Sequence, residues 1–314
     1  HPFFSYDDWF IGSTKITRGI PKEIIKLTKL FDYDDIESLK KLILKYKKDV
    51  ACVVMEPSTS SCPKSSEFTE NCCKKFPCIR NFKKENHFLR QVQNLCNENN
   101  IVFILDEMIT GFRWDLKGAQ KFYNIKPDLS TFGKAMANGF SLAAVSGKRK
   151  IMELGSIEKK NQERVFLLST THGAEMHALG AFVETLKFMK KNSVIEKNWN
   201  YGINLMRKFN ETTSDFDLKN HVYLDGVPCS PILICKNKNK ENSLEFRTLF
   251  LQEMIKNNVL IPWISICYTH NNKTLIKTIS ALKKSLIIYK KALANNCKKY
   301  IQGHIVKPVF RKFN

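Results

Sequence analysis

Short apolar runs alternate with amphipathic segments through the first half of the chain. Ala51–Met55 and Ile101–Leu105 have the length of buried strands, and residues 88–96 between them repeat apolar side chains at helical spacing. A second helical segment at 117–123 then leads to Leu129–Phe132. The order strand, helix, strand, helix, strand predicts a mainly parallel sheet covered by helices, which is an α/β fold.

Residues with charged side chains follow each of these predicted strands. Glu56 follows the first strand, the pair Asp106-Glu107 follows the second, and Lys134 lies in the loop after the third. Ligands of α/β proteins gather at the carboxyl ends of parallel strands. We therefore expect Glu56, Asp106 and Lys134 to lie at one edge of the sheet, where a site can form.

Asp106 and Lys134 together are typical of pyridoxal phosphate enzymes. Such an enzyme needs a lysine to form a Schiff base with the cofactor and a carboxylate to hold a proton on the pyridine nitrogen. Taken singly, Asp106 could cap a turn and Lys134 could be one more solvated lysine. The small neighbours Gly133 and Ala135 favour the functional interpretation, because they allow a bulky group to approach closely.

A run of hydroxyl and amide groups lies at Thr170–Gly173, just before a predicted helix. Such groups in front of a helix form a natural phosphate site. They also form an ordinary helix N-cap. The residues alone leave both interpretations open.

The pattern of the chain changes near residues 210–222, which indicates a second domain. Glu175–Lys191 has the apolar spacing of one long amphipathic helix. Beyond 212 the chain predicts two strands and then two helices, at His221–Leu224, Pro231–Cys235, Phe246–Lys256 and Leu275–Leu293. We expect a large domain over residues 1–211 and a smaller α+β domain over 212–314.

Charge and hydropathy weaken two classes of function. The formal net charge is +21, yet the lysines are scattered along the chain, which argues against a nucleic-acid interface. No apolar run reaches the roughly 18 residues of a transmembrane helix, and the first residues do not resemble a signal peptide. We expect a cytoplasmic protein that binds neither nucleic acid nor membrane.

The ten cysteines lack the spacing of a disulfide framework, so we expect reduced thiols. Cys62, Cys72, Cys73 and Cys78 cluster in a polar stretch over 58–84. None of the four forms a CxxC pair and no histidine lies among them, so their spacing does not fit zinc ligands. We interpret 58–84 as an insertion and expect no metal site.

Three stretches together resemble the class III pyridoxal phosphate aminotransferases. They are Leu105–Arg113, Pro127–Lys134 and Leu168–Gly173, and they occur in the order seen in that family. The chain is most similar to the branch that contains glutamate-1-semialdehyde 2,1-aminomutase and relatives in polysaccharide biosynthesis, which residues 306–314 also resemble. The resemblance covers nearly the whole chain outside 58–84.

The resemblance implies a fold, a cofactor, a substrate class and an oligomeric state. The fold would be that of a fold type I transferase, with a large domain of mainly parallel sheet covered on both faces by helices and a small C-terminal α+β domain. The cofactor would be pyridoxal 5'-phosphate, and the substrates a small-molecule amino donor and acceptor. The active protein would be a homodimer with shared sites.

The same resemblance implies roles for individual residues. Lys134 would be the catalytic lysine that forms the Schiff base, and Asp106 would pair with the pyridine nitrogen. Met108 would pack on one face of the cofactor ring, and Thr171 would reach the phosphate of the partner subunit's cofactor. Glu56, part of a Glu-Pro pair, would support these residues without touching the cofactor.

Two departures from the family pattern bear on function. The family's phosphate-binding Ser-Gly-Thr-Glu loop is absent, so the chain resembles an N-terminally truncated member, and we expect it to bind cofactor weakly and to show little activity. The segment Val259–His270 contains no carboxylate, whereas the aminomutases carry an acidic residue in the corresponding part of the small domain. The lack of this acid favours an ordinary aminotransferase over an aminomutase. By the same resemblance, the substrate of such an aminotransferase would be a keto or aldehyde compound, such as a sugar.

One competing hypothesis makes the chain a catalytically incompetent homologue that acts only as a dimerising or scaffold protein. The missing upstream loop favours this hypothesis. The presence of Lys134, Asp106 and Thr171 disfavours it, because a protein without catalysis has no need of them together.

Overall fold

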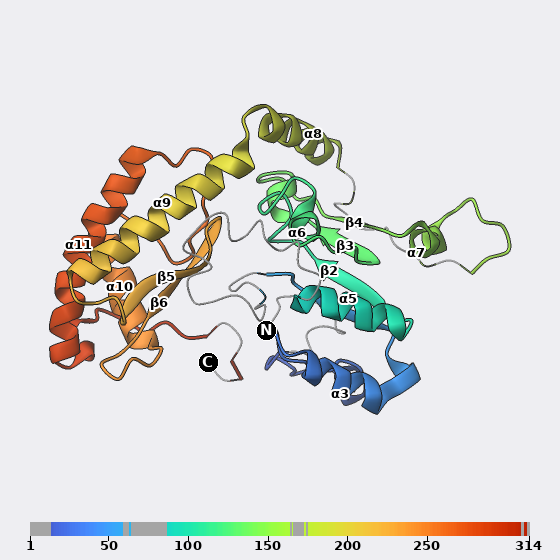
Figure 1. Ribbon diagram of the computed structural model, residues 1–314, viewed down its shortest axis with the longest axis horizontal. Coiled ribbons are helices and arrows are strands. Elements are labelled where there is room, and N and C mark those ends of the chain that lie inside the picture. The colour runs from blue at the N-terminus through green and yellow to red at the C-terminus, as the bar shows by residue number, and fades with distance from the viewer. Residues whose placement is uncertain are drawn as a thin grey trace. The chain divides into compact units, whose positions relative to one another are not determined.

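The chain divides into two compact units (Figure 1). The structure, a computed structural model, describes residues 14–58, 63, 87–163, 165, 173, 175–308 and 311–312. The first unit comprises Leu30–Ile195, and the second comprises Glu196 to the C-terminus with the described residues before Leu30. The boundary expected at 211/212 falls within helix α9 (Val194–Asp215). Apart from Ser58 and Pro63, the insertion expected over 58–84 and its cysteine cluster lie outside the described residues.

A four-stranded sheet with the order β1-β2-β3-β4 forms the centre of the first unit. Strands β1 (Cys52–Met55), β2 (Val102–Asp106) and β3 (Leu129–Phe132) are parallel, as expected, and β4 (Ala144–Gly147) is antiparallel to β3. A parallel partner would need a long crossover, usually with a helix, between the strands. The short connection from Phe132 to Ala144 contains no α-helix, which explains why β4 runs backward.

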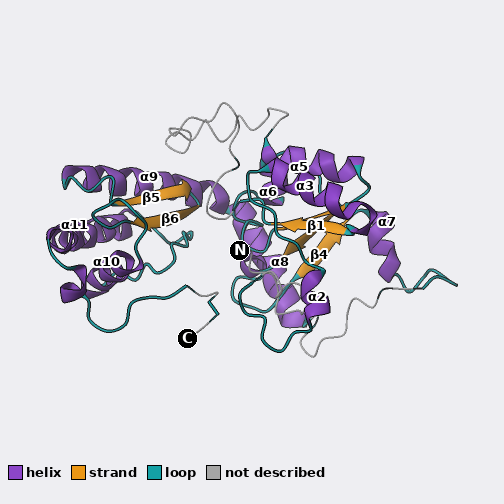
Figure 2. Cartoon of the chain, turned by 90° about the horizontal axis from the view of Figure 1, so that it is seen from below, coloured by secondary structure: helices purple, strands orange, loops and turns teal. Residues whose placement is uncertain are grey.

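Amphipathic helices cover this sheet. Helix α5 (Phe88–Glu98) packs against β2 and buries Leu89 and Val92 completely on its apolar face. Figure 2 shows α5 and α3 (Ile36–Tyr46) together on one side of the sheet. The other helices of the unit are α6 (Gly118–Phe122), α7 (Arg149–Met152) and α8 (Met176–Lys191), and the short 3-10 turns are η1 (Lys47–Asp49), η3 (Lys134–Met136) and η4 (Glu153–Gly155).

The second unit packs three long helices against a β-hairpin. Strands β5 (Val222–Val227) and β6 (Ser230–Cys235) pair antiparallel, and α9, α10 (Leu244–Lys256) and α11 (Asn272–Ala294) cover them (Figure 2). The hydrophobic core between these elements contains the fully buried Leu249, Leu282 and Leu286. The unit also includes α2 (Lys22–Lys26) and η5 (Cys297–Tyr300).

Helices α10 and α11 begin two or three residues before the apolar pattern suggested. Ser243 caps α10 by accepting a hydrogen bond from the amide of Phe246. Asn271 caps α11, where its side chain accepts from the Thr274 amide and the Thr274 hydroxyl accepts from the Asn271 amide. Polar residues at a helix start satisfy free amides but do not follow the apolar repeat, so periodicity locates such a start too late.

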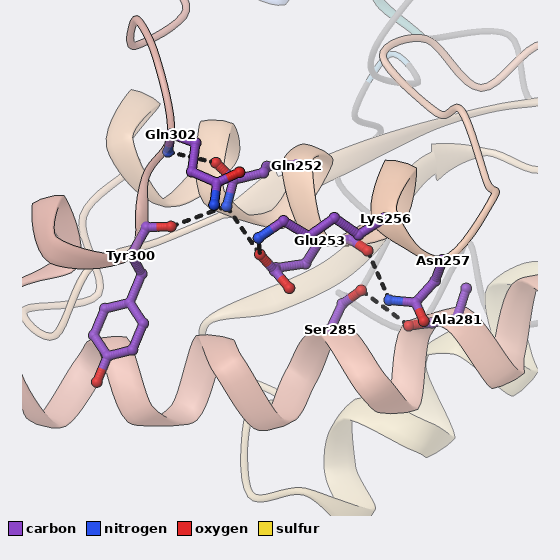
Figure 3. A network of polar contacts seen from close by, with 8 residues as sticks. All are labelled: Gln252, Glu253, Lys256, Asn257, Ala281, Ser285, Tyr300 and Gln302. Carbon is purple, nitrogen blue, oxygen red and sulfur yellow. Dashed lines mark hydrogen bonds and ion pairs between the residues drawn. The ribbon is translucent and has the colours of Figure 1, made fainter.

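One glutamine of α10 binds residues 300–302 of the chain that follows α11 (Figure 3). The side-chain amide of Gln252 donates to the carbonyl of Tyr300 at 2.9 Å, and the amide of Gln302 donates to Oε1 of Gln252 at 2.6 Å. Lys256 Nζ lies 2.8 Å from Oε1 of the neighbouring Glu253. Two opposite hydrogen bonds on one side chain therefore fix the path of residues 300–302.

Two further properties concern the whole of the described chain. None of its described helices combines the length and the apolar character that a membrane crossing requires. The described cysteines, namely Cys52, Cys96, Cys229, Cys235, Cys267 and Cys297, are free thiols. Burial, with the Asp128 carboxylate as a second cause, raises the pKa of Cys96 to about 12, so this thiol stays protonated at neutral pH.

Candidate functional site

Asp106 is the last residue of β2, and only 6% of its surface is exposed. Its Oδ1 accepts two hydrogen bonds, from the amide of Met108 at 2.9 Å and from the hydroxyl of Thr131 at 3.2 Å. Its Oδ2 has no hydrogen-bond partner in the described part of the chain, and it is not among the enclosed polar atoms that lack one. The carboxylate is thus held by one oxygen while the other opens to accessible space.

Lys134 lies just beyond the end of β3, at the first position of η3. Its side chain is exposed, and among the described residues it makes neither a hydrogen bond nor an ion pair. Its backbone has φ +43°, in the left-handed region. Because β2 and β3 are parallel neighbours, Asp106 and Lys134 lie at the same carboxyl edge of the sheet, as expected.

Gly133 places Lys134 against the loop that follows β2. A Cβ atom at position 133 would stand 2.3 Å from Cε and 2.8 Å from Sδ of Met108. The sequence suggested that a small residue beside Lys134 leaves room for a bulky group. In the structure the group that approaches Gly133 is the thioether of Met108, so these two residues join the loop after Asp106 to the segment that carries Lys134.

Glu107, which follows Asp106, has a structural role that the sequence did not reveal. The residue is fully buried, and its Oε2 accepts from the Thr110 hydroxyl and the Ala119 amide, both at 2.7 Å. Its Oε1 accepts from the amide of Gln120 at 2.8 Å. Burial raises the pKa of the Glu107 carboxyl above its ordinary 4.5, although these three hydrogen bonds act in the opposite direction. Glu107 therefore closes the loop 107–118 directly behind Asp106.

An aromatic cluster packs the same loop onto β3 and α8. The ring of Phe112 lies 5.9 Å from the ring of Phe132 and 5.7 Å from that of Phe182. Gly111 permits this contact, because a Cβ there would come within 2.6 Å of Phe132. The adjacent residues Gly111 and Phe112, shortly after the acidic pair, are the sequence signal for this packing.

Asp128 and Lys148 secure β3 at the opposite edge of the sheet. Asp128 Oδ2 accepts from the Phe103 amide at 2.7 Å, and its Oδ1 lies 2.5 Å from Lys148 Nζ. Asp128 precedes β3, whereas Asp106 ends β2, so the two carboxylates serve different edges. We assign Asp128 to holding the strands together rather than to the site.

The other expected site residues are Glu56, Met108 and Thr171. Glu56 directly follows β1 and is half-buried, at the same sheet edge as Asp106. Met108 lies in the loop after Asp106, against Gly133. Thr171 lies outside the described residues, as do Thr170 and His172. The helix expected after them is present, since α8 begins at Met176 with Glu175 as its N-cap.

Comparison with known proteins matches the sequence to one family. The family model for class III aminotransferases matches residues 81–251. The 3-aminobutyryl-CoA aminotransferase of Cloacimonas acidaminovorans (strain Evry) is 28% identical over 297 residues, which cover 92% of this chain and 65% of that protein. The glutamate-1-semialdehyde 2,1-aminomutase of Francisella philomiragia is 29% identical over 282 residues, which cover 85% of this chain and 59% of that protein. The chain thus spans less than two thirds of the length of these relatives.

Solved structures match the fold. The FumI protein of Sphingopyxis sp. MTA144, in its pyridoxal phosphate internal aldimine form, has a TM-score of 0.73 and 17% identity, and the match covers 93% of this chain and 64% of that one. An omega-transaminase from Sphaerobacter thermophilus has a TM-score of 0.69 and 16% identity, with 88% of this chain and 60% of that chain covered. The fold is therefore that of the fold type I transferases, as the resemblance in the sequence implied.

Proposed function

Because the chain belongs to the class III aminotransferase family, we propose that it takes part in amino-group transfer with pyridoxal 5'-phosphate as its cofactor and Lys134 as the residue that binds it covalently. The observation that carries the proposal is the arrangement at one sheet edge. An exposed lysine follows β3, and a buried aspartate with one open oxygen ends the neighbouring strand β2. If Lys134 were only a solvated lysine and Asp106 only a turn cap, nothing would require the two residues to lie at the same sheet edge.

The described residues fit the pyridine half of the cofactor. A ring nitrogen that keeps its proton needs an anionic acceptor held in a fixed place, and Asp106 offers Oδ2 while Oδ1 is already bound twice. Covalent attachment needs an amine without competing partners, and Lys134 has none among the described residues. The Met108 thioether supplies apolar surface beside Gly133 for contact with a flat ring.

The chemistry of the proposed reaction follows from these groups. When bound, pyridoxal phosphate supplies an electron sink that stabilises negative charge on the substrate carbon. Asp106 holds the proton at the ring nitrogen through Oδ2, which keeps that sink effective. Lys134 Nζ would hold the cofactor and would move the proton taken from the substrate carbon. Thr171, by the family resemblance, binds phosphate in a homodimer with shared sites.

The substrate class is the finer part of the proposal. Both an aminotransferase and an aminomutase are among the similar relatives. An aminomutase has to retain its diamino intermediate so that one molecule passes through both half-reactions. The segment Val259–His270 lacks a carboxylate, which favours an ordinary aminotransferase over a glutamate-1-semialdehyde aminomutase. The resemblance to relatives in polysaccharide biosynthesis supports a keto or aldehyde substrate, such as a sugar.

Borohydride trapping tests the assignment of Lys134. The chain is incubated with pyridoxal phosphate, reduced, digested and analysed by mass spectrometry; reduction makes the bond permanent, so even weak binding accumulates. We expect the label on Lys134 above every other lysine, its loss in Lys134→Ala, and its retention in Lys121→Ala, which changes an exposed lysine of α6. Equal labelling of many lysines would refute the proposal.

A second experiment separates catalysis from a scaffold role. The chain is incubated with pyridoxal phosphate without borohydride and is then mixed with a panel of amino donors. The loss of its visible absorbance is recorded. An aminotransferase converts the cofactor to its amine form with at least one donor. A protein that takes up the cofactor on Lys134 but reacts with no donor would support the competing scaffold hypothesis.

A further inference from the structure

We propose that Thr131 is a positioning residue that holds Asp106 so that Oδ2 stays directed toward the cofactor's ring nitrogen. The inference rests on the proposed function, and it assigns to β3 a second task beside presenting Lys134. It starts from one hydrogen bond, in which the Thr131 hydroxyl donates to Asp106 Oδ1 at 3.2 Å.

The sheet register creates this contact. Asp106 and Thr131 are paired positions on the parallel strands β2 and β3. Side chains at paired positions lie on the same face and close enough to interact. Threonine is stiff about its first side-chain torsion, so a threonine at this position presents its hydroxyl with little loss of freedom.

The second donor to the same oxygen completes the restraint. The Met108 amide donates to Oδ1 at 2.9 Å from the loop that follows β2. The end torsion of an aspartate is broad and rotates easily, so one hydrogen bond from the local backbone leaves the carboxylate free to turn. A donor from the neighbouring strand stops that rotation, and Oδ2 remains available.

Other charged groups near Asp106 do not replace Thr131. The adjacent carboxylate of Glu107 is already bound to Thr110, Ala119 and Gln120. Lys134, on the same edge, makes no ion pair with Asp106. The orientation of Oδ2 in the described structure therefore depends on the Met108 amide and the Thr131 hydroxyl, of which only the hydroxyl can be removed by substitution.

The test compares variants that keep or remove this hydroxyl. Thr131→Val preserves the shape and removes the donor, Thr131→Ser restores a donor, and Ser130→Ala is the matched control because it removes the neighbouring hydroxyl from the same strand. The full chain is titrated with pyridoxal phosphate, and both the affinity and the pH profile of the visible absorbance are recorded, with the Lys134→Ala signal subtracted.

We expect Thr131→Val to weaken cofactor binding by about tenfold, as the loss of a hydrogen bond to a charged group implies. The pH profile of its visible absorbance should change, because the pKa of the ring nitrogen falls when this nitrogen loses its fixed anionic partner. Thr131→Ser and Ser130→Ala should resemble the wild type. A purely structural role would lower stability without moving the pH profile.

A double-mutant cycle covers the case in which Thr131→Val binds no cofactor at all. Unfolding free energies are measured for Thr131→Val, Asp106→Ala and the double variant. We expect the threonine substitution to cost less in the Asp106→Ala background, since its partner is already gone; additive effects would overturn the inference.

The outcomes separate the inference from the proposed function. Labelling of Lys134 in the wild type, with an unchanged affinity and pH profile in Thr131→Val, would overturn the positioning role alone. A wild type that takes up no label on Lys134 would overturn the proposed function and this inference with it.

Discussion

The carboxylate of Glu107 fills the space in which a side chain at position 118 would stand. A Cβ atom on Gly118 would lie 2.5 Å from Oε1 of Glu107, and Gly118 has φ +80°. The glycine therefore serves two purposes at once, since it adopts a left-handed backbone and lets the carboxylate reach the first amides of α6. Through this pair the loop behind Asp106 closes on itself.

Gly118→Ala should destabilise the protein by about 3 kcal/mol, because a left-handed alanine is strained and its methyl group overlaps the Glu107 carboxylate. Gly303→Ala is a matched control, since Gly303 has φ +86° with no atom within 4 Å of the added Cβ. That change should cost only the strain, about 1 kcal/mol. Urea unfolding measures both, and equal losses would contradict the steric role of Glu107.

Glu107 should make stability depend on pH in a defined direction. Burial raises the pKa of its carboxyl in the folded state above the ordinary 4.5, so the folded protein keeps the proton to higher pH than the unfolded chain. The contribution of this group is then complete below pH 4.5 and is lost as the pH rises through the raised pKa. Glu107→Gln cannot titrate, so its unfolding free energy should decline less than that of the wild type over this range. Parallel pH curves for the two proteins would contradict the prediction.

Tyr289 should stabilise the second unit through its hydroxyl. The residue is fully buried in α11, and its hydroxyl donates to the Lys236 carbonyl at 2.6 Å and accepts from the Lys236 amide at 3.0 Å. Tyr289→Phe should cost about 1 kcal/mol, since the buried carbonyl loses its donor. Tyr300→Phe is the control, because that hydroxyl accepts a single surface bond at 3.4 Å. Guanidinium unfolding of both variants checks the difference.

Gln252 should determine how firmly the segment after α11 is held. Gln252→Leu removes both hydrogen bonds to residues 300–302, which should cost about 2 kcal/mol and speed hydrogen exchange at the Gln302 amide. Gln302→Ala is the control, because Gln302 takes part through its backbone. Exchange mass spectrometry that finds the same protection in Gln252→Leu as in the wild type would show that other contacts hold this segment.

Helix α5 was predicted from its apolar repeat, whereas α9 was not predicted. The pattern at residues 88–96 corresponds to α5 (Phe88–Glu98), because the repeat follows directly from the helical turn. Helix α9 carries many polar residues, and it buries Trp199 and Phe209 with 3% and 1% of their surfaces exposed. The buried residues of α9, such as Gly202, Leu205 and Phe209, also recur at helical spacing, so the repeat is present in the sequence although polar residues make it less evident.

The candidate site also has features that were predictable from the sequence and features that were not. Residue types and positions along the chain identified Asp106 and Lys134 and predicted their common sheet edge, because side chains that follow parallel strands meet at one edge. The packing of Met108 against Gly133 and the enclosure of Glu107 by the start of α6 were not predictable from that pattern.

The sequence by itself determined the α/β alternation and singled out Asp106 and Lys134 as the candidate site residues, since periodicity and side-chain chemistry are local properties. Only the tertiary structure decided that Thr131 donates to Oδ1 of Asp106 and that Oδ2 stays open. That choice depends on the register between β2 and β3, which is set by contacts between residues far apart in the chain.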